Sequence, residues 1–525
     1  MTTFDLPTGF LHTHDVWRIF LSFVSLYIAY VVASAIYNAF FSPLSKFPGP
    51  KLWSISKIPR TLVMVSGNEG QGYANLHHKY GPIVRTGPRE LSFAGGAQAF
   101  KDVYGFRKHG RPTPHKDPMF YGASLNKAPS VILADDAGHS RQRKILSHAF
   151  SDKALKEQEP LLKRWSQLLR TKLSERADGH SGTDMVKFYN CTTFDIMGDL
   201  TFSEGLDMLQ GGEYNPWVKT IFASIKNGTM FRSLRGQNAF LKYIMDNVVF
   251  KSKAVRKMAW EHNKYTVDRV DRRLELEPEH EDLWAKILTK DNEDGGLSLE
   301  EHYSNASLFM IAGTETTATA LSGTTYYLLR NPDCMEKLTK EIRRAFSDFD
   351  DVTLEGLARL KYTQAVLQEG LRMYPPVPIG QFCISDTSCS TANTEVALPR
   401  VTPKEGAVIC DQHIPGDVSI GVNHFATYRQ PDHFKNAYEF HPERWLGDPE
   451  YKDDDLDALE PFSVGPRNCL GKNLAWHEMR MLLITVLLHF DLKLSEESKN
   501  WSNQKIYTLW EKVPLMCTFT PVAEA

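Results

Sequence analysis

Cys469 lies in a stretch whose residue types and spacing are suited to metal chemistry. The pattern is F-x-x-G-x-R-x-C-x-G, formed by Phe462, Gly465, Arg467, Cys469 and Gly471, and an apolar helix is predicted to follow from Leu474 to Leu488. A helix N-terminus has partial positive charge and unpaired N–H groups, which favour a thiolate over a thiol. The glycines let the backbone pass close to a flat or bulky group, and Arg467 is a cation suited to a carboxylate partner. A thiolate ligand to haem iron needs this arrangement, whereas the alternative is a buried structural cysteine beside a turn.

A long predicted helix carries a second candidate site. Ser298 and Glu301 form a capping-box pattern, and the helical pattern continues to about Leu329, where Asn331 and Pro332 end it. A helix of this length extends ~45 Å at 1.5 Å per residue. It is therefore long enough to cross a whole domain.

The middle of this helix contains Ala312, Gly313, Glu315 and Thr316. Glycine inside a helix costs ~1 kcal/mol relative to alanine, so Gly313 indicates close approach by a ligand. Ala312 and Thr316 share one face, where a threonine hydroxyl can bend the helix hydrogen bonding and leave room for a water molecule or dioxygen. Glu315 adds a protonatable group beside it. The alternative is a buried helix with small residues for packing, but an acid in such a helix is costly without a partner.

Two further pairs of polar residues have helical spacing. His139 and Arg143 share one helix face, where two donors could bind a pair of carboxylates; the alternative is a solvated basic helix. Glu369 and Arg372 form the pattern E-x-x-R, which is a weak signal by itself, and Arg444 follows downstream.

In their order along the chain, and over nearly its whole length, these motifs resemble those of the cytochrome P450 family. The amino-acid sequences of the motifs are most similar to those of fungal microsomal hydroxylases of sesquiterpene and polyketide secondary metabolism. The resemblance implies a mainly α fold, in which a long central helix lies over haem beside a small β portion, preceded by one N-terminal transmembrane helix.

The resemblance also implies roles around the cofactor, which would be haem b. Cys469 would be the axial thiolate ligand of the iron, and Arg143 and His139 would bind the haem propionates. The family commonly has tryptophan where this chain has His139, so this position departs from the pattern but keeps an N–H donor. Other cofactor contacts implied by the resemblance are Arg467, Phe462, Gly465, Gly471, Ala312 and Gly313.

Catalytic and structural roles follow from the same resemblance. Thr316 and Glu315 would help to deliver protons to oxygen bound at the iron. Glu369, Arg372 and Arg444 would form a buried ionic triad that braces the haem loop, as structural residues rather than catalysts.

Composition excludes several classes of protein. The chain has 525 residues, with 61 Lys and Arg against 63 Asp and Glu, so nothing favours a nucleic-acid binder. Its seven cysteines form no regular framework, which argues against a secreted disulfide scaffold. No glycine- and serine-rich linker divides the main body, although the length exceeds the ~150 residues usual for one domain.

The N-terminal region contains a candidate membrane anchor. No charged residue occurs from Ile19 to Phe41, a stretch of 23 residues that is long enough to span a bilayer. A cleaved signal peptide is the alternative, but its apolar core is usually shorter and follows a basic start. Lys46 and Lys51 after the span, against Arg18 before it, favour a cytosolic C-terminal side.

These boundaries predict four parts of the chain. Residues 1–18 form a non-cytosolic segment, 19–41 the transmembrane anchor, 42–51 a proline-rich hinge and 52–525 the haem-thiolate domain. Within the last part, the stretch from Leu76 to Gly87 predicts a helix end, a turn and a strand. The adjacent histidines His77 and His78 point in different directions from a helix, so surface exposure is predicted for them rather than a metal site.

Residues 381–397 interrupt the family pattern. Members of the family usually pass directly from a Pro-Ile-Gly-like segment to Leu-Pro-Arg-like residues, here 398–400, whereas this chain has 17 additional polar residues from Gln381 to Ala397. Seventeen codons are 51 nucleotides, and the amino acids are compatible with intron donor, branch and acceptor sequences. One hypothesis is therefore an unspliced intron, and the alternative is a genuine surface loop.

The predicted function is that of a haem-thiolate monooxygenase in the endoplasmic reticulum membrane, single-pass with a cytosolic catalytic domain. It would oxidise a small apolar substrate with dioxygen and electrons from NADPH, delivered by cytochrome P450 reductase with cytochrome b5 as an optional second donor. The alternatives are a thiolate-haem isomerase or dehydratase that needs no external electrons, against which the intact Glu315 and Thr316 argue, and a non-catalytic haem-binding protein.

Overall fold

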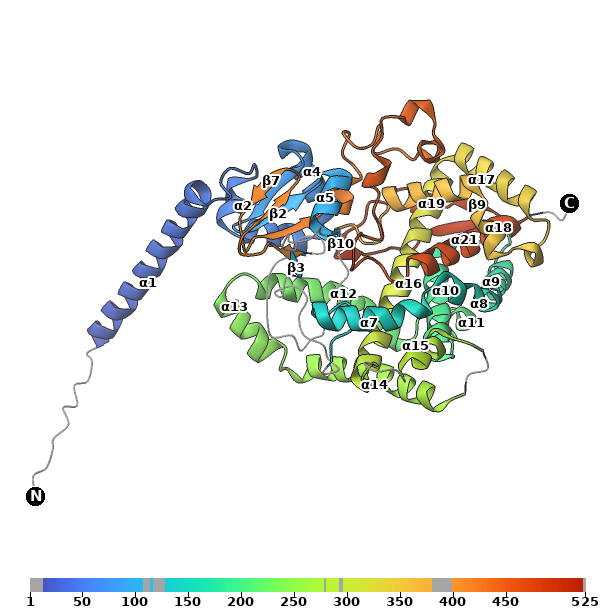
Figure 1. The fold of residues 1–525 in the computed structure, drawn as a ribbon, viewed down its shortest axis with the longest axis horizontal. Helices are drawn as coiled ribbons and strands as arrows, with labels where there is room; N and C mark the ends of the chain where they lie inside the picture. The colour runs from blue at the N-terminus through green and yellow to red at the C-terminus, as the bar shows by residue number, and fades with distance from the viewer. Residues whose placement is uncertain are drawn as a thin grey trace, which may run out of the picture.

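The computed structural model describes residues 13–106, 114–116, 128–277, 280–291, 296–379 and 399–522. These residues form a mainly helical body from which one N-terminal helix projects (Figure 1). The predicted mainly α fold with a small β portion is confirmed.

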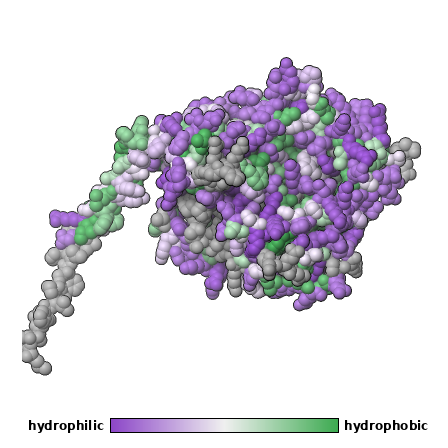
Figure 2. Space-filling model, in the orientation of Figure 1, coloured by the Kyte–Doolittle hydropathy of each residue, from purple (hydrophilic) through white to green (hydrophobic). Residues whose placement is uncertain are grey.

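The projecting helix is α1 (Thr13–Ile36), which continues as the short helix η1 (Tyr37–Phe41). The stretch Trp17–Phe41 contains an 18-residue window with a mean hydropathy of 2.2, and none of that window is buried. The helix is hydrophobic over much of its length, whereas the visible face of the body is mostly hydrophilic (Figure 2). It is therefore long and apolar enough to cross a bilayer.

The segment after this helix is packed against the body. Leu44 and Phe47 are buried in a hydrophobic cluster with residues of the small sheet. The guanidinium of Arg85 donates a 2.8 Å hydrogen bond to the carbonyl of Asn38, and the Arg85 amide donates a 2.7 Å bond to the carbonyl of Pro48. A Cβ at Gly49 would come within 2.4 Å of the Arg85 carbonyl oxygen, so this close approach requires glycine. The proline-rich stretch thus joins the anchor to the sheet through specific contacts.

The main sheet has five strands in the order β1-β2-β8-β5-β3. It combines the N-terminal strands β1 (Ile83–Gly87), β2 (Glu90–Phe93) and β3 (His115–Lys116) with the later strands β5 (Arg400–Val401) and β8 (Ser419–Val422). Only β2 and β8 pair in parallel among these neighbours. The predicted strand at residues 83–87 is β1.

The prediction of surface exposure is wrong for His77. It lies in α4 (Glu69–Tyr80) with 1% of its surface exposed, and its Nε2 is 2.8 Å from the hydroxyl of Ser92 on β2. Its Nδ1 is 3.0 Å from the carbonyl of Gly81. Burial lowers the pKa of His77 to about 4, so the ring is neutral. His78, on the next position, is exposed as predicted.

The centre of the helical body is α16 (Leu299–Arg330). Both hydrogen bonds of the predicted capping box are present: Ser298 accepts from the Glu301 amide at 3.2 Å, and the Glu301 carboxylate accepts from the Ser298 amide at 2.9 Å. Helix α10 (Met185–Phe202) lies along it, joined by a 2.9 Å contact between the hydroxyls of Tyr189 and Thr325.

Two other helices position the predicted motifs around α16. Helix α19 (Lys361–Met373) carries the E-x-x-R pair, and α21 (Lys472–His489) follows the cysteine loop. A Cβ at Gly370 would come within 2.1 Å of the Thr324 hydroxyl, so glycine allows α19 to approach α16 closely.

The remaining elements complete the body around this centre. The other α-helices are α2 (Lys51–Ile55), α3 (Ile58–Val65), α5 (Gly96–Tyr104), α7 (Asp136–Ala149), α8 (Asp152–Glu157), α9 (Glu159–Ser174), α11 (Met208–Gly211), α12 (Pro216–Arg235), α13 (Ala239–Ile244), α14 (Lys253–Glu275), α15 (Leu283–Asp291), α17 (Pro332–Ala345), α18 (Leu354–Ala358) and α20 (His424–Thr427). Further short helices are η2 (Met245–Val249), η3 (Phe349–Asp351), η4 (Pro442–Leu446), η5 (Pro449–Tyr451), η6 (Leu456–Ala458) and η7 (Glu496–Ser498). Small sheets are formed by β6 (Ala407–Ile409) with β7 (Gln412–Ile414), by β10 (Ile506–Tyr507) with β11 (Leu509–Trp510), and by β4 (Thr183–Asp184), β12 (Met516–Pro521) and β9 (Phe490–Leu494). The 17 additional residues 381–397 lie outside the described residues.

Candidate active site

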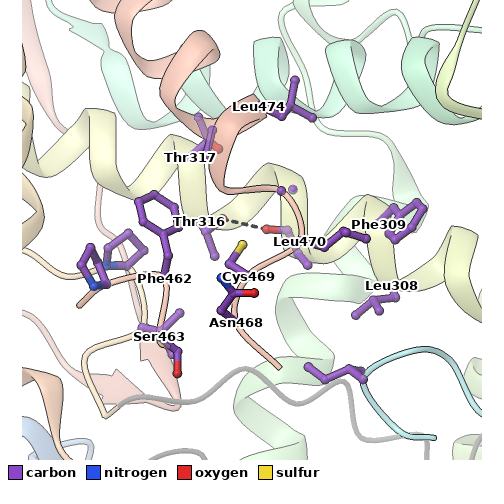
Figure 3. A pocket seen from close by; sticks show the side chains of 18 of the residues that line it. Leu308, Phe309, Thr316, Thr317, Phe462, Ser463, Asn468, Cys469, Leu470 and Leu474 are labelled. Atoms are coloured by element: carbon purple, nitrogen blue, oxygen red, sulfur yellow. Dashed lines mark hydrogen bonds between the residues drawn. The ribbon is translucent and has the colours of Figure 1, made fainter. Parts of the chain in front are cut away.

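A cavity of about 270 Å³ lies between α16 and the cysteine loop. Its walls are mostly apolar, with Leu308 and Phe309 from α16 and Val131, Ile132 and Val377 from loops. The sulfur of Cys469 points from its loop toward the helix that carries Thr316 (Figure 3). The cavity therefore places one thiol opposite one hydroxyl in an apolar setting.

The cysteine loop is held by its own backbone before α21 begins. The amide of Cys469 donates a 2.9 Å hydrogen bond to the carbonyl of Phe462. Burial raises the pKa of the Cys469 thiol, while the Gly471 amide and the Arg143 guanidinium oppose this shift. The Gly471 amide at the start of α21 thus favours the thiolate, while desolvation of the sulfur opposes it. A bound cation would supply the missing stabilisation.

The two glycines of the loop have different surroundings. Gly471 lines the cavity, and the nearest atom to a Cβ built there is 3.9 Å away. Gly465 is not among the lining residues; it has φ +80°, and a Cβ there would come within 2.1 Å of the Tyr104 carbonyl oxygen. Gly465 thus seats the loop against α5, and Phe462 lines the cavity.

Basic and imidazole side chains gather at one part of the cavity. His139 and Arg143, both on α7, and Arg467 all line it. Arg143 donates to the carbonyl and side-chain oxygens of Asn468 at 2.6 and 2.7 Å, and Arg467 donates to Asp136 at 2.7 Å. His139 is buried, and desolvation together with the neighbouring Arg467 lowers its pKa to about 4. His139 is therefore a neutral donor among cations.

Three cavity residues were missed from the sequence. Lys116 and Arg400 come from the paired strands β3 and β5, and His424 begins α20. The ammonium of Lys116 donates to the carbonyls of Ile132 and Ala134 at 2.6 and 2.5 Å, and burial lowers its pKa to about 7. The signal for Arg400 was its place in the Leu-Pro-Arg segment, but nothing local marked Lys116 or His424.

His424 presents an unpartnered atom in the cavity wall. Its Nδ1 donates to the carbonyl of Val377 at 3.1 Å, and its Nε2 is buried without a hydrogen-bond partner among the described residues. Burial lowers the pKa of His424 to about 4, so Nε2 is a neutral acceptor. A ligand that enters this cavity can complete its hydrogen bonding.

Ala312, Gly313 and Thr316 line the opposite wall, on α16. The Thr316 hydroxyl donates a 2.7 Å hydrogen bond to the Ala312 carbonyl, one turn earlier. A Cβ at Gly313 would come within 2.8 Å of the sulfur of Met197 on α10. Gly313 therefore allows α10 to pack closely against α16 and also leaves the cavity wall open. The small residues thus serve both of the roles considered from the sequence, helix packing and space for a ligand.

Glu315 is not among the lining residues of the cavity, although it precedes Thr316. Its side chain is buried, and its Oε1 accepts a 2.6 Å hydrogen bond from the ammonium of Lys512, near the C-terminus. Burial raises the pKa of Glu315, and the Lys512 ammonium opposes this shift. The sequence showed that this acid needed a partner, but not which residue supplied it.

A second buried acid was also missed. Glu478 on α21 lines the cavity, and neither of its carboxylate oxygens has a hydrogen-bond partner among the described residues. Burial raises the pKa of Glu478 to about 8. Glu478 is therefore mainly neutral at pH 7.

The predicted ionic triad of Glu369, Arg372 and Arg444 comes together, and none of its members lines the cavity. Arg372 contacts Glu369 at 2.7 Å, and Arg444 contacts the same carboxylate at 3.2 Å, with all three side chains fully buried. Trp445 donates to Glu369 at 2.9 Å, and Asp454 pairs with Arg444. Burial alone would raise the pKa of Glu369, but the two guanidinium groups outweigh it and the net pKa is lowered. The cluster joins α19 to η4.

Comparison with known proteins identifies the family. The family model "Cytochrome P450" matches residues 46–390 and 391–519, and the chain belongs to the cytochrome P450 family. It is 47% identical over 507 residues to cytochrome P450 monooxygenase efuB of Hormonema carpetanum, covering 95% of this chain and 96% of that protein. It is 38% identical to trichothecene C-15 hydroxylase of Fusarium sporotrichioides over 94% of this chain and 96% of that protein. It is 35% identical to averantin hydroxylase of Dothistroma septosporum over 96% of this chain and 91% of that protein.

The family implies haem iron with a cysteine thiolate ligand, and the residues of the cavity fit this group. Haem needs one axial donor, cations for its two propionates and a close, small-residue surface on the opposite face. The structure offers Cys469, a cationic region with Arg143 and Arg467, and the wall formed by Ala312 and Gly313. The orphaned Nε2 of His424 is a further polar atom that a ligand can satisfy.

Proposed function

We propose that this protein is a membrane-anchored haem-thiolate monooxygenase that hydroxylates, or otherwise oxidises, a small apolar metabolite in fungal secondary metabolism. The observation that carries the proposal is the placement of Cys469 and Thr316 on opposite walls of one apolar cavity. The similarity to hydroxylases of a trichothecene and of averantin favours a terpenoid or polyketide substrate. That substrate class rests on analogy between relatives.

The cofactor supplies oxygen activation and insertion, and the chain supplies the ligand, the orientation and the proton path. In this proposal Cys469 holds the iron, and its deprotonation is favoured by the metal charge. Arg143, Arg467 and the neutral His139 bind the propionates and fix the orientation of the ring. The apolar side chains of Leu308 and Phe309 on α16 exclude water from the cavity and contact the substrate.

Thr316 and Glu315 are proposed to deliver protons to the cavity. The Thr316 hydroxyl faces the cavity and can hold a water molecule through its remaining lone pairs while it donates to the Ala312 carbonyl. Glu315 lies one residue earlier, where its carboxylate can exchange protons with the protein interior. The geometry separates the roles: Thr316 acts at the cavity wall, and Glu315 acts behind it.

The electrons are proposed to come from NADPH through cytochrome P450 reductase, with cytochrome b5 as an optional second donor. The proposed location is the endoplasmic reticulum membrane, with residues 1–18 outside the cytosol, 19–41 spanning the bilayer, 42–51 joining anchor to body and 52–525 in the cytosol. The apolar, unburied helix α1 supports a membrane location.

Spectroscopy and turnover test this function together. The reduced, CO-bound haem protein should show the strongly red-shifted Soret band of thiolate ligation, and Cys469→Ser should lose it while remaining folded. With reductase, the enzyme should consume NADPH in response to terpenoid or polyketide substrates. Conversion of a substrate without electrons would instead identify an isomerase or dehydratase, and a spectral response without any conversion would identify a non-catalytic haem protein.

The same spectrum decides the status of residues 381–397. We propose that they derive from an unspliced intron; the family match divides between residues 390 and 391, inside this stretch. The red-shifted band should then form fully only in the protein that lacks Gln381–Ala397. Equal bands in both versions, or mature transcripts that retain the 51 nucleotides, would make the stretch a genuine loop.

A further inference from the structure

The ion pair between Glu315 and Lys512 is enclosed in the protein interior. The side chains are 4% and 5% exposed, respectively, and the Lys512 ammonium is 2.6 Å from the Glu315 carboxylate. The two residues are 197 positions apart, and Lys512 lies between β11 and β12. This contact therefore brings the C-terminal part of the chain to the middle of α16.

The ammonium of Lys512 has an acceptor for each of its three N–H donors. Besides Glu315, it donates to the Thr319 hydroxyl at 2.7 Å and to the Asn190 side-chain oxygen at 3.4 Å. Thr319 is one helical turn after Glu315, so both lie on one face of α16. These contacts keep the Glu315 side chain on a face beside, rather than on, the cavity wall.

Only one of the two Glu315 carboxylate oxygens accepts a hydrogen bond in these contacts. Its Oε1 accepts from Lys512, whereas its Oε2 is buried without a hydrogen-bond partner among the described residues. A buried carboxylate oxygen without a donor is costly. Oε2 is therefore the atom at which a water molecule or a transferred proton would be stabilised.

The pair is also connected toward the surface. Asn190 donates to the hydroxyl of Tyr214 at 2.9 Å, and Tyr214 is only partly buried. Glu511, the neighbour of Lys512, is exposed and pairs with Lys226 at the protein surface. Lys512 thus lies between the solvent side of the molecule and the acid beside Thr316.

We propose that Lys512 is the positioning residue of the proton path. It holds the ionised Glu315 carboxylate away from the cavity; Glu315 takes up a proton from the solvent side and leaves Lys512 as a neutral acid. After it has passed this proton to the Thr316 side, the carboxylate returns to Lys512. This inference rests on the proposed monooxygenase function. Burial raises the pKa of Glu315, which favours its protonation, and lowers that of Lys512. Other titratable groups also interact electrostatically with this pair: Tyr214 and Tyr374 with Glu315, and Asp184 with Lys512.

A purely structural role is the competing explanation. In that case Lys512 would only tie the C-terminal segment to α10 and α16, and its removal would lower stability without acting through Glu315. The two explanations differ in whether the effect of Lys512 depends on Glu315 being an acid. A double-mutant cycle measures this dependence.

The experiment uses the full-length haem protein and its variants Lys512→Met, Lys512→Arg, Glu315→Gln and the double variant Glu315→Gln/Lys512→Met. Lys226→Met is the matched control, because it removes a lysine that pairs with the adjacent Glu511 at the surface. The CO-bound spectrum verifies that each variant is folded. Two readouts follow: the infrared carbonyl band of a protonated carboxyl group, and the share of NADPH electrons that ends in product rather than hydrogen peroxide.

Lys512→Met should create a protonated-carboxyl band that is absent from the double variant, since desolvation then acts on Glu315 unopposed. It should lower the product share about tenfold, less than the ~10²–10⁴-fold typical of a general acid or base itself, because Glu315 is still present. Lys512→Arg should restore most of the product share. In the Glu315→Gln background, adding Lys512→Met should change the share by less than about twofold. Lys226→Met should behave as the wild type.

The inference is overturned if folded Lys512→Met shows no new carboxyl band, or if its effect on the product share is the same with Gln at position 315. If Lys512→Met does not fold, Lys512→Arg and the charge-neutral double variant carry the comparison. Wild-type protein without any NADPH-dependent turnover would refute the proposed function instead, and the infrared band would still decide whether Lys512 controls the protonation of Glu315.

Discussion

At the scale of single residues, two threonines on α16 allow the role of one hydroxyl to be isolated. Thr316 lines the cavity and donates to Ala312, whereas Thr314 is buried, is not among the lining residues and donates to Met310 at 2.6 Å. Both therefore bond to the carbonyl four residues earlier, and only one has access to the cavity.

We predict that Thr316→Val lowers product formation per NADPH by about 100-fold, the lower end of the range for proton-transfer groups. The change removes the hydroxyl and keeps the shape of the side chain. Thr314→Val, the control, should keep the product yield of the wild type. Product and hydrogen peroxide are quantified in the same reaction, and equal losses in the two variants would assign the effect to the helix rather than to the hydroxyl.

The raised pKa of Glu478 predicts how the stability of the protein depends on pH. Its pKa is about 8 in the folded protein, against a reference value of 4.5, so the folded state retains a proton that the unfolded state releases. Its contribution to stability therefore falls as the pH rises from about 4.5 to about 8 and is constant above that. Glu478→Gln, which cannot ionise, should lose this part of the pH dependence.

Unfolding midpoints measured from pH 5 to pH 8.5 test this prediction. The difference in stability between Glu478→Gln and the wild type should grow in favour of the variant as the pH rises, by up to ~1.4 kcal/mol per pH unit. Parallel curves for the two proteins would show that Glu478 does not hold its proton in the folded state.

At the scale of secondary-structure elements, the Glu369 cluster is the main polar connection between α19 and η4. Glu369 accepts from both arginines, Trp445 and the His441 amide, and all of the charged partners are buried. Removing one member of a buried ionic cluster is costly because the remaining charges stay desolvated.

We predict that Glu369→Gln lowers the free energy of unfolding by ~3–5 kcal/mol and reduces haem retention. Lys337→Met is the matched control: it removes a partly exposed ion pair with Glu443, which is worth at most ~1 kcal/mol. Because the pKa of Glu369 is lowered, its stabilisation should be present at neutral pH and be lost as the pH falls below about 4.5. Urea unfolding at pH 7 and pH 4 measures both effects, and similar losses for the two variants would contradict the prediction.

At the scale of the whole molecule, the anchor and the body meet at Arg85. Its side chain donates to Asn38 at the end of the anchor and its amide donates to Pro48 in the following segment. The membrane-spanning and packed parts of the N-terminus can therefore be separated by the position of a truncation.

We predict that removal of residues 1–36 releases the protein from phospholipid vesicles without changing its CO-bound spectrum, because Leu44, Phe47 and the partners of Arg85 remain. Removal of residues 1–47 should in addition lower stability, since it deletes two buried hydrophobic side chains. Vesicle sedimentation and thermal unfolding are the measurements. Continued vesicle binding after the shorter truncation would place the main membrane contact elsewhere, and microsomal protein that lacks the anchor would indicate a cleaved signal peptide.

The sequence by itself determined the features that depend on neighbouring residues. The capping box at Ser298 predicted the start of α16 because both of its hydrogen bonds are local. The uncharged stretch from Ile19 predicted α1 because crossing a bilayer depends on length and hydropathy alone. The pattern around Cys469 likewise predicted a loop that opens a helix.

Only the tertiary structure decided which distant groups come into contact and which side chains lose their contact with water. It paired Glu315 with Lys512, 197 residues away, and placed Glu478 in the cavity wall with no hydrogen-bond partner among the residues that the structure describes. It buried His77, which the sequence had predicted to be exposed, against Ser92 of β2. These outcomes depend on desolvation and long-range packing, which no local spacing encodes, because they arise only when separate segments exclude water from one another.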